Sequence, residues 1–369
     1  MILRRKMKNK IKKILKIILI ILASILALGV MAVIFLRLSN YLHHRIELRD
    51  GVNETTYIDI NGQKQYIMIM GHDESNPVII YLHGGPSSPD TCITYSFTDY
   101  LTDEYTVISW DQRGCGRTYF KNIKSDPENS TASFEQALDD LDALVTYACK
   151  RFGKDKVIIM GHSYGTALGS TYVKKYPEKV SAYIGIGQLV SLEEADIHSY
   201  NDALNKAKAA GDSISSLEEK YAKFCEKPGI PTLLELRELT SKYHPVTKKA
   251  DHMGLSLFSP YAGIDDLRWL LIQMGDIEKY VSLNQKLFDF ALSFNAWANG
   301  TSYEMPVCII QGSEDWVCPT DMAGNYLDAV ESPYKKFYVI EGCGHDVHCA
   351  KPKEFCADLK DFLNSSKSN

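Results

Sequence analysis

Length, composition and charge narrow the classes of protein to which this chain can belong. The 369 residues are 45% hydrophobic and 24% charged, an ordinary globular composition with enough apolar material for a large core. The formal net charge is -5, yet residues 1–16 hold eight Lys and Arg and no acid, so the remainder is markedly acidic. This disfavours a nucleic-acid-binding protein, because phosphate binding needs a basic face on the folded part.

Residues 14–36 are apolar except for Lys16 and Ser24. As a helix this stretch spans roughly 34 Å, enough to cross a hydrocarbon core of about 30 Å. The pattern predicts a transmembrane helix over 14–36 after a basic segment over 1–13. A cleaved signal peptide is the alternative, although no convincing small-x-small cleavage site precedes Arg37. By the positive-inside rule, we expect a single-pass membrane protein with a cytoplasmic N-terminus and the following domain outside.

The spacing of the nine cysteines does not indicate a regular disulfide framework, and an exported domain would usually pair its cysteines, whereas nine is an odd number. Either the compartment is reducing or anaerobic, or one thiol stays free. The sequence leaves their redox state and the oligomeric state open.

Beyond residue 50, apolar runs typical of strands alternate with helical patterns. A hairpin is predicted around Asn61-Gly62, where two alternating segments meet. The other predicted strands cover 77–85, 105–114, 156–161, 180–188, 306–312 and 335–342. The predicted helices include 134–152, which ends before Gly153, as well as 164–177 and 352–366.

This alternation predicts an α/β fold with a mainly parallel sheet. Residues 190–302 interrupt it with helical patterns and no clear strand. We therefore expect a core formed by 50–189 and 303–366, and a helical cap over 190–302 that covers the carboxyl edge of the sheet. Ligands of such folds bind at that edge.

Ser163 lies in "VIIMGHSYGTALG", where a buried strand gives way to Gly-x-Ser-x-Gly and a helix. This context is typical of a nucleophile elbow, in which the serine occupies a strained turn and glycines avoid collisions. The alternative is a glycine-rich packing turn.

A serine nucleophile needs a base, and the base needs an orienting acid. Asp315 and His345 each follow a later predicted strand, at the same sheet edge as Ser163. We predict that His345 is the base and Asp315 the acid, and that the neighbouring Glu314 points elsewhere.

Two backbone N–H groups are expected to stabilise the oxyanion. Tyr164, directly after the nucleophile, supplies one. The glycine-rich loop "LHGGPSS" supplies the other through Gly85, with Gly84 as the second choice.

Five segments taken together resemble one family: "HGGPS", "DQRGCGRT", "GHSYGT", "GSEDWVCP" and "GCGHD". They are similar to the proline iminopeptidase group of α/β hydrolases, over roughly residues 50–365. The family pattern has glycine where this chain has Ser87 and serine where it has Thr118; Ser87 is expected to narrow the loop and alter substrate choice. In this family Asp111, Arg113 and Gly114 belong to a signature beneath the site, although a structural ion pair is the favoured role of Arg113 here.

The resemblance implies an aminopeptidase with acidic cap residues that bind the substrate's free ammonium group. Glu193 and Glu194, at the start of the predicted cap, are the candidates; the alternative is a solvated helix start, where acids are favoured anyway. The segment "CGHDVHC" offers metal-ligand types, but four ligands within seven residues are poorly spaced for a tetrahedral site. No metal or organic cofactor is predicted.

The resulting hypothesis is a serine hydrolase that acts on small peptides through an acyl-enzyme. A carboxylesterase or lipase-like hydrolase of small esters is the first alternative, since fold does not fix substrate. A non-catalytic, membrane-tethered binding protein is the second.

Overall fold

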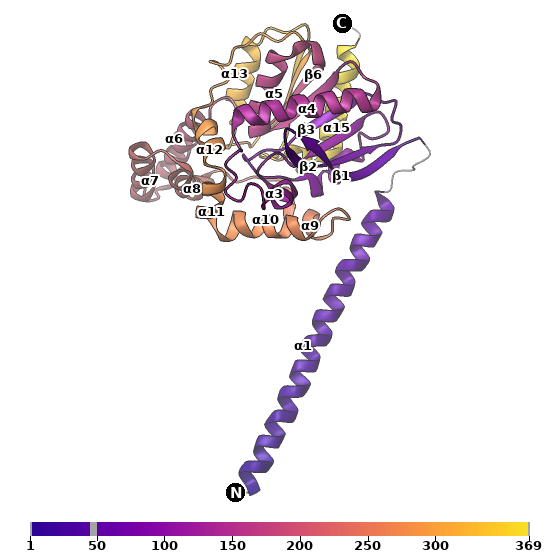
Figure 1. Ribbon diagram of the computed structural model, residues 1–369. Helices are drawn as coiled ribbons and strands as arrows, with labels where there is room; N and C mark the ends of the chain where they lie inside the picture. Colours follow the sequence, from indigo (N-terminus) through magenta and orange to yellow (C-terminus); the bar gives the residue numbers. More distant parts are fainter. Residues whose placement is uncertain (1, 45–49, 368–369) are drawn as a thin grey trace.

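The computed structural model describes residues 2–44 and 50–367, which form a long N-terminal helix and an α/β domain (Figure 1). The domain contains one eight-stranded sheet in the order β1-β2-β4-β3-β5-β6-β7-β8. The strands are β1 (Val52–Ile60), β2 (Gln63–Gly71), β3 (Val78–Leu82), β4 (Thr106–Trp110), β5 (Val157–His162), β6 (Val180–Ile186), β7 (Val307–Gly312) and β8 (Lys335–Ile340).

The sheet is mainly parallel, as predicted. Strands β3 to β8 pair in parallel, and the antiparallel pairs are β1 with β2 and β2 with β4. Asn61 and Gly62 connect β1 to β2 with φ angles of 44° and 80°. Positive φ at both central residues gives a turn whose twist matches the flanking strands, which confirms the predicted hairpin.

Helices cover both faces of the sheet (Figure 1). One apolar core lies between the sheet and α4, α5 and α13, and a second lies between the opposite face and α2, α14 and α15. The helices of this part are α2 (Tyr95–Thr98), α3 (Gly116–Asn122), α4 (Phe134–Phe152), α5 (Tyr164–Lys175), α13 (Thr320–Ala329), α14 (Val347–Ala350) and α15 (Pro352–Ser366). Gly153 ends α4 in the left-handed conformation, as the sequence predicted.

The segment between β6 and β7 is a helical cap with its own small core. Its helices are α6 (Leu192–Ala210), α7 (Ser215–Glu226), α8 (Ile230–Thr240), α9 (His252–Leu257), α10 (Ile264–Gly275), α11 (Ile277–Leu283) and α12 (Gln285–Ser293). Trp269, Tyr280 and Phe288 pack in that core against Tyr119 of α3. The cap is therefore fastened to the sheet domain by apolar contacts.

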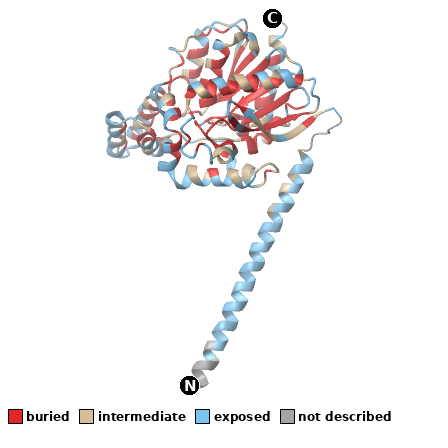
Figure 2. Ribbon diagram, in the orientation of Figure 1, coloured by how far each residue is buried: buried red, intermediate tan, exposed pale blue. Residues whose placement is uncertain are grey.

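The N-terminal helix α1 (Ile2–His43) is long and apolar enough, by length and composition, to cross a membrane. It contains the predicted span 14–36 and continues into the predicted basic segment, of which Met1 lies outside the described residues. Figure 2 shows the helix exposed over nearly all of its described length.

Candidate active site

Ser163 occupies a strained turn between β5 and α5. Its φ and ψ angles are 53° and -121°, and its N–H donates to the Ile186 carbonyl at 2.9 Å. A side chain at Gly161 would meet the Gly165 carbonyl oxygen at 2.3 Å, and one at Gly165 would meet the Leu82 carbonyl oxygen at 2.2 Å. The two glycines let the turn pack against its neighbours, so the sequence forms the tight elbow that presents Ser163.

Asp315 and His345, from the turns after β7 and β8, form a hydrogen-bonded pair. His345 Nδ1 donates to Asp315 Oδ2 at 2.9 Å. The other carboxylate oxygen accepts the N–H groups of Val317 and Cys318, at 3.0 and 2.9 Å. Gln311 Nε2 donates to Asp315 Oδ2 at 3.2 Å. Four donors thus fix the orientation of the carboxylate, which in turn fixes the imidazole.

The environment of His345 suits a proton acceptor. Burial lowers the pKa of His345, but the charge of Asp315 and its hydrogen bond outweigh burial and raise the pKa above its ordinary value. His345 Nε2 is buried, and no residue in the described part of the chain, Ser163 included, forms a hydrogen bond with it. Hydrogen bonds between catalytic groups are often longer before substrate binds, so this nitrogen is free to receive the serine proton.

Glu314 points away from this pair, as predicted. Its carboxylate accepts the hydroxyl of Thr247 at 2.8 Å and the backbone N–H of the same residue at 2.5 Å.

The candidate oxyanion donors lie beside the nucleophile. Tyr164 is the first residue of α5, so its N–H has no acceptor within the helix. Gly84 and Gly85 line the same cavity as Ser163. A side chain at Gly84 would lie 2.9 Å from Ser163 Cβ, so the absence of one lets the loop approach the nucleophile. The structure brings all three predicted residues to the serine.

Ser87, the departure from the family pattern, bonds the loop that contains Gly84 and Gly85, here called the oxyanion loop after its expected role, to the cap. It has a φ angle of 62°, which explains why glycine suits this position. Its hydroxyl donates to Asn284 Oδ1 at 2.7 Å, and its carbonyl accepts from Trp269 Nε1 at 3.0 Å. Tyr280 donates to the neighbouring Pro86 carbonyl at 2.7 Å. The Ser87 hydroxyl therefore bonds to the cap, and Ser87 is not among the cavity-lining residues.

A cavity of about 380 Å³ lies over Ser163 and His345, between the sheet edge and the cap. The cap contributes Arg237 from α8, His252 and Ser256 from α9, and Leu270 and Gln273 from α10. Arg237 is held by a bidentate ion pair with buried Asp196, at 2.7 and 2.9 Å. The positive charge of Arg237 at the roof of the cavity is therefore balanced by the carboxylate of Asp196.

Within the described part of the chain, two carboxyl groups line this cavity, those of Asp90 and Asp346. Asp346 Oδ2 lies 3.3 Å from His252 Nε2, and Asp346 Oδ1 lies 3.5 Å from His162 Nε2. Burial would raise the pKa of Asp346, but the hydrogen bond from His252 and the neighbouring histidine charges hold it well below its usual range. Burial raises the pKa of Asp90 to about 7. Of the two carboxyl groups, Asp346 therefore favours the ionised form more strongly.

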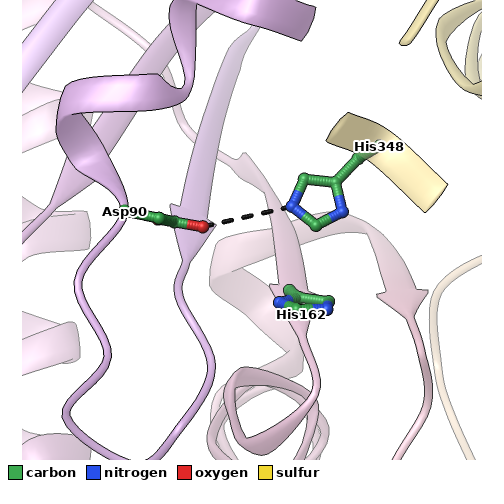
Figure 3. A group of neighbouring side chains, drawn as sticks. All are labelled: Asp90, His162 and His348. Carbon is green, nitrogen blue, oxygen red and sulfur yellow. Dashed lines mark ion pairs between the residues drawn. The ribbon is translucent and has the colours of Figure 1, made fainter. Parts of the chain in front are cut away.

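Figure 3 shows Asp90, His162 and His348. Each offers one atom that could bind a metal ion, and these three atoms lie within 4.8 Å of one another. Among the described residues, this group has the donor types to hold a metal ion. The Tyr81 hydroxyl already donates to Asp90 Oδ2 at 2.6 Å and lies 3.2 Å from His348 Nε2. Of the four candidate ligands in "CGHDVHC", only His348 belongs to this group; Cys343 is buried in an apolar core.

Glu193 and Glu194 are not part of the cavity, contrary to the expectation for substrate-binding residues. Both are exposed in the first turn of α6, and Glu194 Oε1 accepts from Asn295 at 3.1 Å. The helix N-terminus favours acids there, which accounts for both residues.

Arg113 forms the predicted structural ion pair. Its guanidinium donates to both oxygens of Asp140, at 2.6 and 2.9 Å, and both side chains are almost completely buried.

Sequence reasoning missed Asp90, Asp346 and the cap residues of the cavity. Asp346 carried a signal, because it directly follows His345 in "GCGHD". Arg237, Leu270 and Gln273 carried none, since each sits in an ordinary helical pattern.

Comparison with known proteins places the chain in a family. It matches the family model of the alpha/beta hydrolase fold over residues 77–352. It is 24% identical over 312 residues to the probable aminopeptidase YbaC of Bacillus subtilis (strain 168), covering 82% of this chain and 93% of that protein. It is 25% identical over 298 residues to the proline iminopeptidase PfmaB of Pestalotiopsis fici, covering 80% and 94%.

Among solved structures, VinJ superposes with a TM-score of 0.60 at 16% identity, covering 85% of this chain and 99% of that one, which shows a shared fold. The family match includes the strand ends that carry Ser163, Asp315 and His345. This chain therefore belongs to the α/β hydrolase fold family.

Proposed function

We propose that this chain is a serine hydrolase that cleaves acyl bonds through a covalent acyl-enzyme. The observation that carries the proposal is the Asp315–His345 hydrogen bond of 2.9 Å, with His345 and the elbow serine Ser163 lining one cavity. A nucleophile, a base and an orienting acid in this relation are the parts that acyl transfer requires.

In the proposed mechanism, Ser163 Oγ attacks the scissile carbonyl and His345 Nε2 takes the serine proton. The N–H groups of Tyr164 and Gly85, with Gly84 as the alternative to Gly85, stabilise the negatively charged oxygen of the tetrahedral intermediate. The intermediate collapses, and the leaving group departs with the proton from His345. Water then attacks the acyl-enzyme while His345 takes its proton. The bond between the acyl group and Ser163 Oγ breaks, His345 returns the proton to Oγ, and the acid product leaves. Asp315 stabilises the imidazolium throughout.

We infer that the substrates are peptides from which the enzyme releases the N-terminal residue. Two relatives that align over most of the chain are named as a probable aminopeptidase and a proline iminopeptidase. A free N-terminal ammonium needs a carboxylate partner within the cavity. Asp346 lines that cavity and has a lowered pKa, and Asp90 Oδ1 is buried there with no hydrogen-bond partner among the described residues. These two residues replace Glu193 and Glu194 as the proposed ammonium site.

We further propose that α1 anchors the enzyme in a membrane, with the N-terminus in the cytoplasm and the α/β domain on the other side. The length and composition of α1 support the anchor. Its orientation follows from the basic residues that precede the apolar stretch.

The decisive experiment compares the full-length protein in detergent with its Ser163→Ala variant. The substrates are a prolyl arylamide, other unblocked aminoacyl arylamides, their N-blocked forms and a short-chain aryl ester. We expect Ser163-dependent cleavage of the unblocked amides and loss of cleavage on blocking. Turnover of the ester alone identifies an esterase instead. Failure of a fluorophosphonate probe to label Ser163 favours a non-catalytic binding protein.

The ammonium site has its own test. Asp346→Asn should raise KM for unblocked amides and leave the ester unaffected, because only the amides carry the charge. Glu193→Gln with Glu194→Gln is the matched control and should change neither. Equal effects of Asp346→Asn on both substrates would assign Asp346 to the structure of the site instead.

A further inference from the structure

The outward face of the cap carries an unpartnered apolar stripe. On α10, Ile264, Leu267, Leu271 and Met274 recur at helical spacing on one face, and Met253 and Leu257 extend it along α9. These six side chains, here called the outer stripe, are between 45% and 73% exposed. A surface helix normally turns such a stripe toward the core, so this one is built to meet something outside the domain.

The opposite face of α10 is already occupied. Trp269 is buried and donates to the Ser87 carbonyl, and Gln273 Nε2 donates to Ser88 Oγ at 3.0 Å. Leu270 lines the cavity over Ser163. Rotation of α10 to bury the outer stripe would break these bonds, so the stripe stays outward in the folded enzyme.

The end of α1 is fastened beside the outer stripe. Arg37, the residue directly after the apolar span, donates to the Leu257 carbonyl at 2.8 Å and the Ala262 carbonyl at 3.3 Å. Asn40 Nδ2 donates to the Phe258 carbonyl at 2.9 Å. These acceptors lie at the end of α9 and in the connection to α10, and Figure 1 shows both helices on the side of the domain from which α1 leaves.

The position of Arg37 sets the level of the outer stripe relative to a bilayer. The hydrocarbon-spanning part of α1 ends at Leu36, so Arg37 marks the boundary between acyl chains and headgroups. Because Arg37 bonds to the α9–α10 connection, the outer stripe lies near the same boundary. Apolar helix faces insert into this layer to a depth of about 5–10 Å.

We propose that the outer stripe seats α9 and α10 in the surface of the bilayer that α1 crosses. The proposal rests on the membrane anchor in the proposed function. We favour a bilayer over a second copy of the chain or a soluble partner as the occupant of the outer stripe. A bilayer that α1 crosses lies beside the stripe in every molecule, whereas the other two would have to be recruited. The bilayer then covers one face of the helices that roof the cavity, and the catalytic serine operates at the membrane surface.

The test uses the full-length protein in lipid nanodiscs, with an environment-sensitive fluorophore on a single introduced cysteine. Cys149→Ser and Cys225→Ser remove the half-buried and the exposed native thiols. The reporter sites are Leu271→Cys on the outer stripe and Leu26→Cys in α1. Val339→Cys on β8 is the matched control, since Val339 is also an exposed apolar residue, at 40%. The probes are phospholipids with a quenching spin label on the acyl chain. The label sits near the headgroup to read Leu271→Cys and Val339→Cys, and near the bilayer centre to read Leu26→Cys, which lies in the middle of the apolar span.

The proposal predicts quenching at Leu271→Cys that approaches the value at Leu26→Cys and exceeds that at Val339→Cys severalfold. Quenching at Leu26→Cys but none above the control at Leu271→Cys would overturn the proposal and leave the anchor intact. No quenching at either site would overturn both. Energy transfer between two labelled copies without quenching by lipid would show that the stripe pairs with a second chain, which also overturns it.

A second variant tests the same contact from the other direction. Leu267→Glu with Leu271→Glu places charges on exposed positions, so the detergent-solubilised protein should keep its melting temperature. In nanodiscs, a reporter at Met274→Cys should lose most of its quenching in that background. Val339→Glu should leave it unchanged. Unchanged quenching in the double-charge variant would also contradict the proposal.

Discussion

The sheet edge and the cap form opposite walls of one cavity, but they are specified in different ways. At the edge, each candidate catalytic residue follows a strand within a few positions, and glycines fix the turn through backbone contacts, as at Gly161 and Gly165. In the cap, Arg237 and Leu270 reach the cavity from the sides of helices. A tight turn requires particular residues, such as glycine, and these are recognisable as a motif in the sequence. A helix pattern does not show which side of the helix will face a cavity. We therefore expect mutations at the edge to act on chemistry and mutations in the cap to act on substrate choice.

The largest expected effect is that of Asp315→Asn at the sheet edge. Loss of the carboxylate removes the group that orients His345 and stabilises its imidazolium, so kcat should fall on the order of 10³- to 10⁴-fold. Glu314→Gln is the matched control, because that carboxylate bonds to Thr247 and should leave kcat nearly unchanged. Similar losses in the two variants would contradict the assignment of the acid.

Arg113→Ala tests the buried ion pair between Arg113 and Asp140. It leaves the buried Asp140 carboxylate without its cation, which should lower the free energy of unfolding by about 3–5 kcal/mol. Urea unfolding in detergent measures the change. Lys64→Ala breaks the exposed pair with Asp59 and should cost about 0–1 kcal/mol. Equal decreases in the free energy of unfolding for the two variants would show that burial of the Arg113–Asp140 pair does not affect its contribution.

Gly84→Ala should lower kcat by on the order of 10²-fold, because the new methyl group would lie 2.9 Å from Ser163 Cβ and displace the oxyanion loop. Gly275→Ala, at the end of α10, meets no atom within 4 Å and should leave the kinetics unchanged. A normal kcat in Gly84→Ala would place the oxyanion donors elsewhere.

In the cap, Leu270→Ala should raise KM by up to about tenfold and leave kcat almost unchanged, because it removes apolar contact with substrate and not a catalytic group. Leu267→Ala, on the outer stripe of the same helix, should change neither constant in detergent. A fall in kcat without a change in KM for Leu270→Ala would contradict the expectation that the sheet edge controls chemistry and the cap controls substrate choice.

The smallest expected effect is on the pH dependence of kcat/KM. Protonated His345 cannot accept the serine proton, so activity should fall as the pH drops through the pKa of His345. That pKa is raised above 6.5 by Asp315, so the acid limb should lie above 6.5 and move to lower pH in Asp315→Asn. An acid limb that does not move would assign it to another group, such as Asp90.

The sequence predicted the mainly parallel sheet, the hairpin at Asn61-Gly62 and the end of α4 at Gly153, because each depends on local periodicity or on one backbone conformation. It also singled out Ser163, Asp315 and His345, which the structure gathers at one edge. It failed for Glu193 and Glu194, since two acids at the start of a helix have the same pattern whether they face a cavity or water.

The sequence by itself therefore determined the positions that local backbone geometry constrains. These are the elbow serine with its glycines, and the polar residues that follow buried strands. Only the tertiary structure decided what surrounds them. It tied the Ser87 loop to the cap, placed Asp346 in the cavity and turned the outer stripe away from the core. The physical reason is that these contacts join segments far apart in the chain, and the direction of a helix face is set by packing rather than by its own residues.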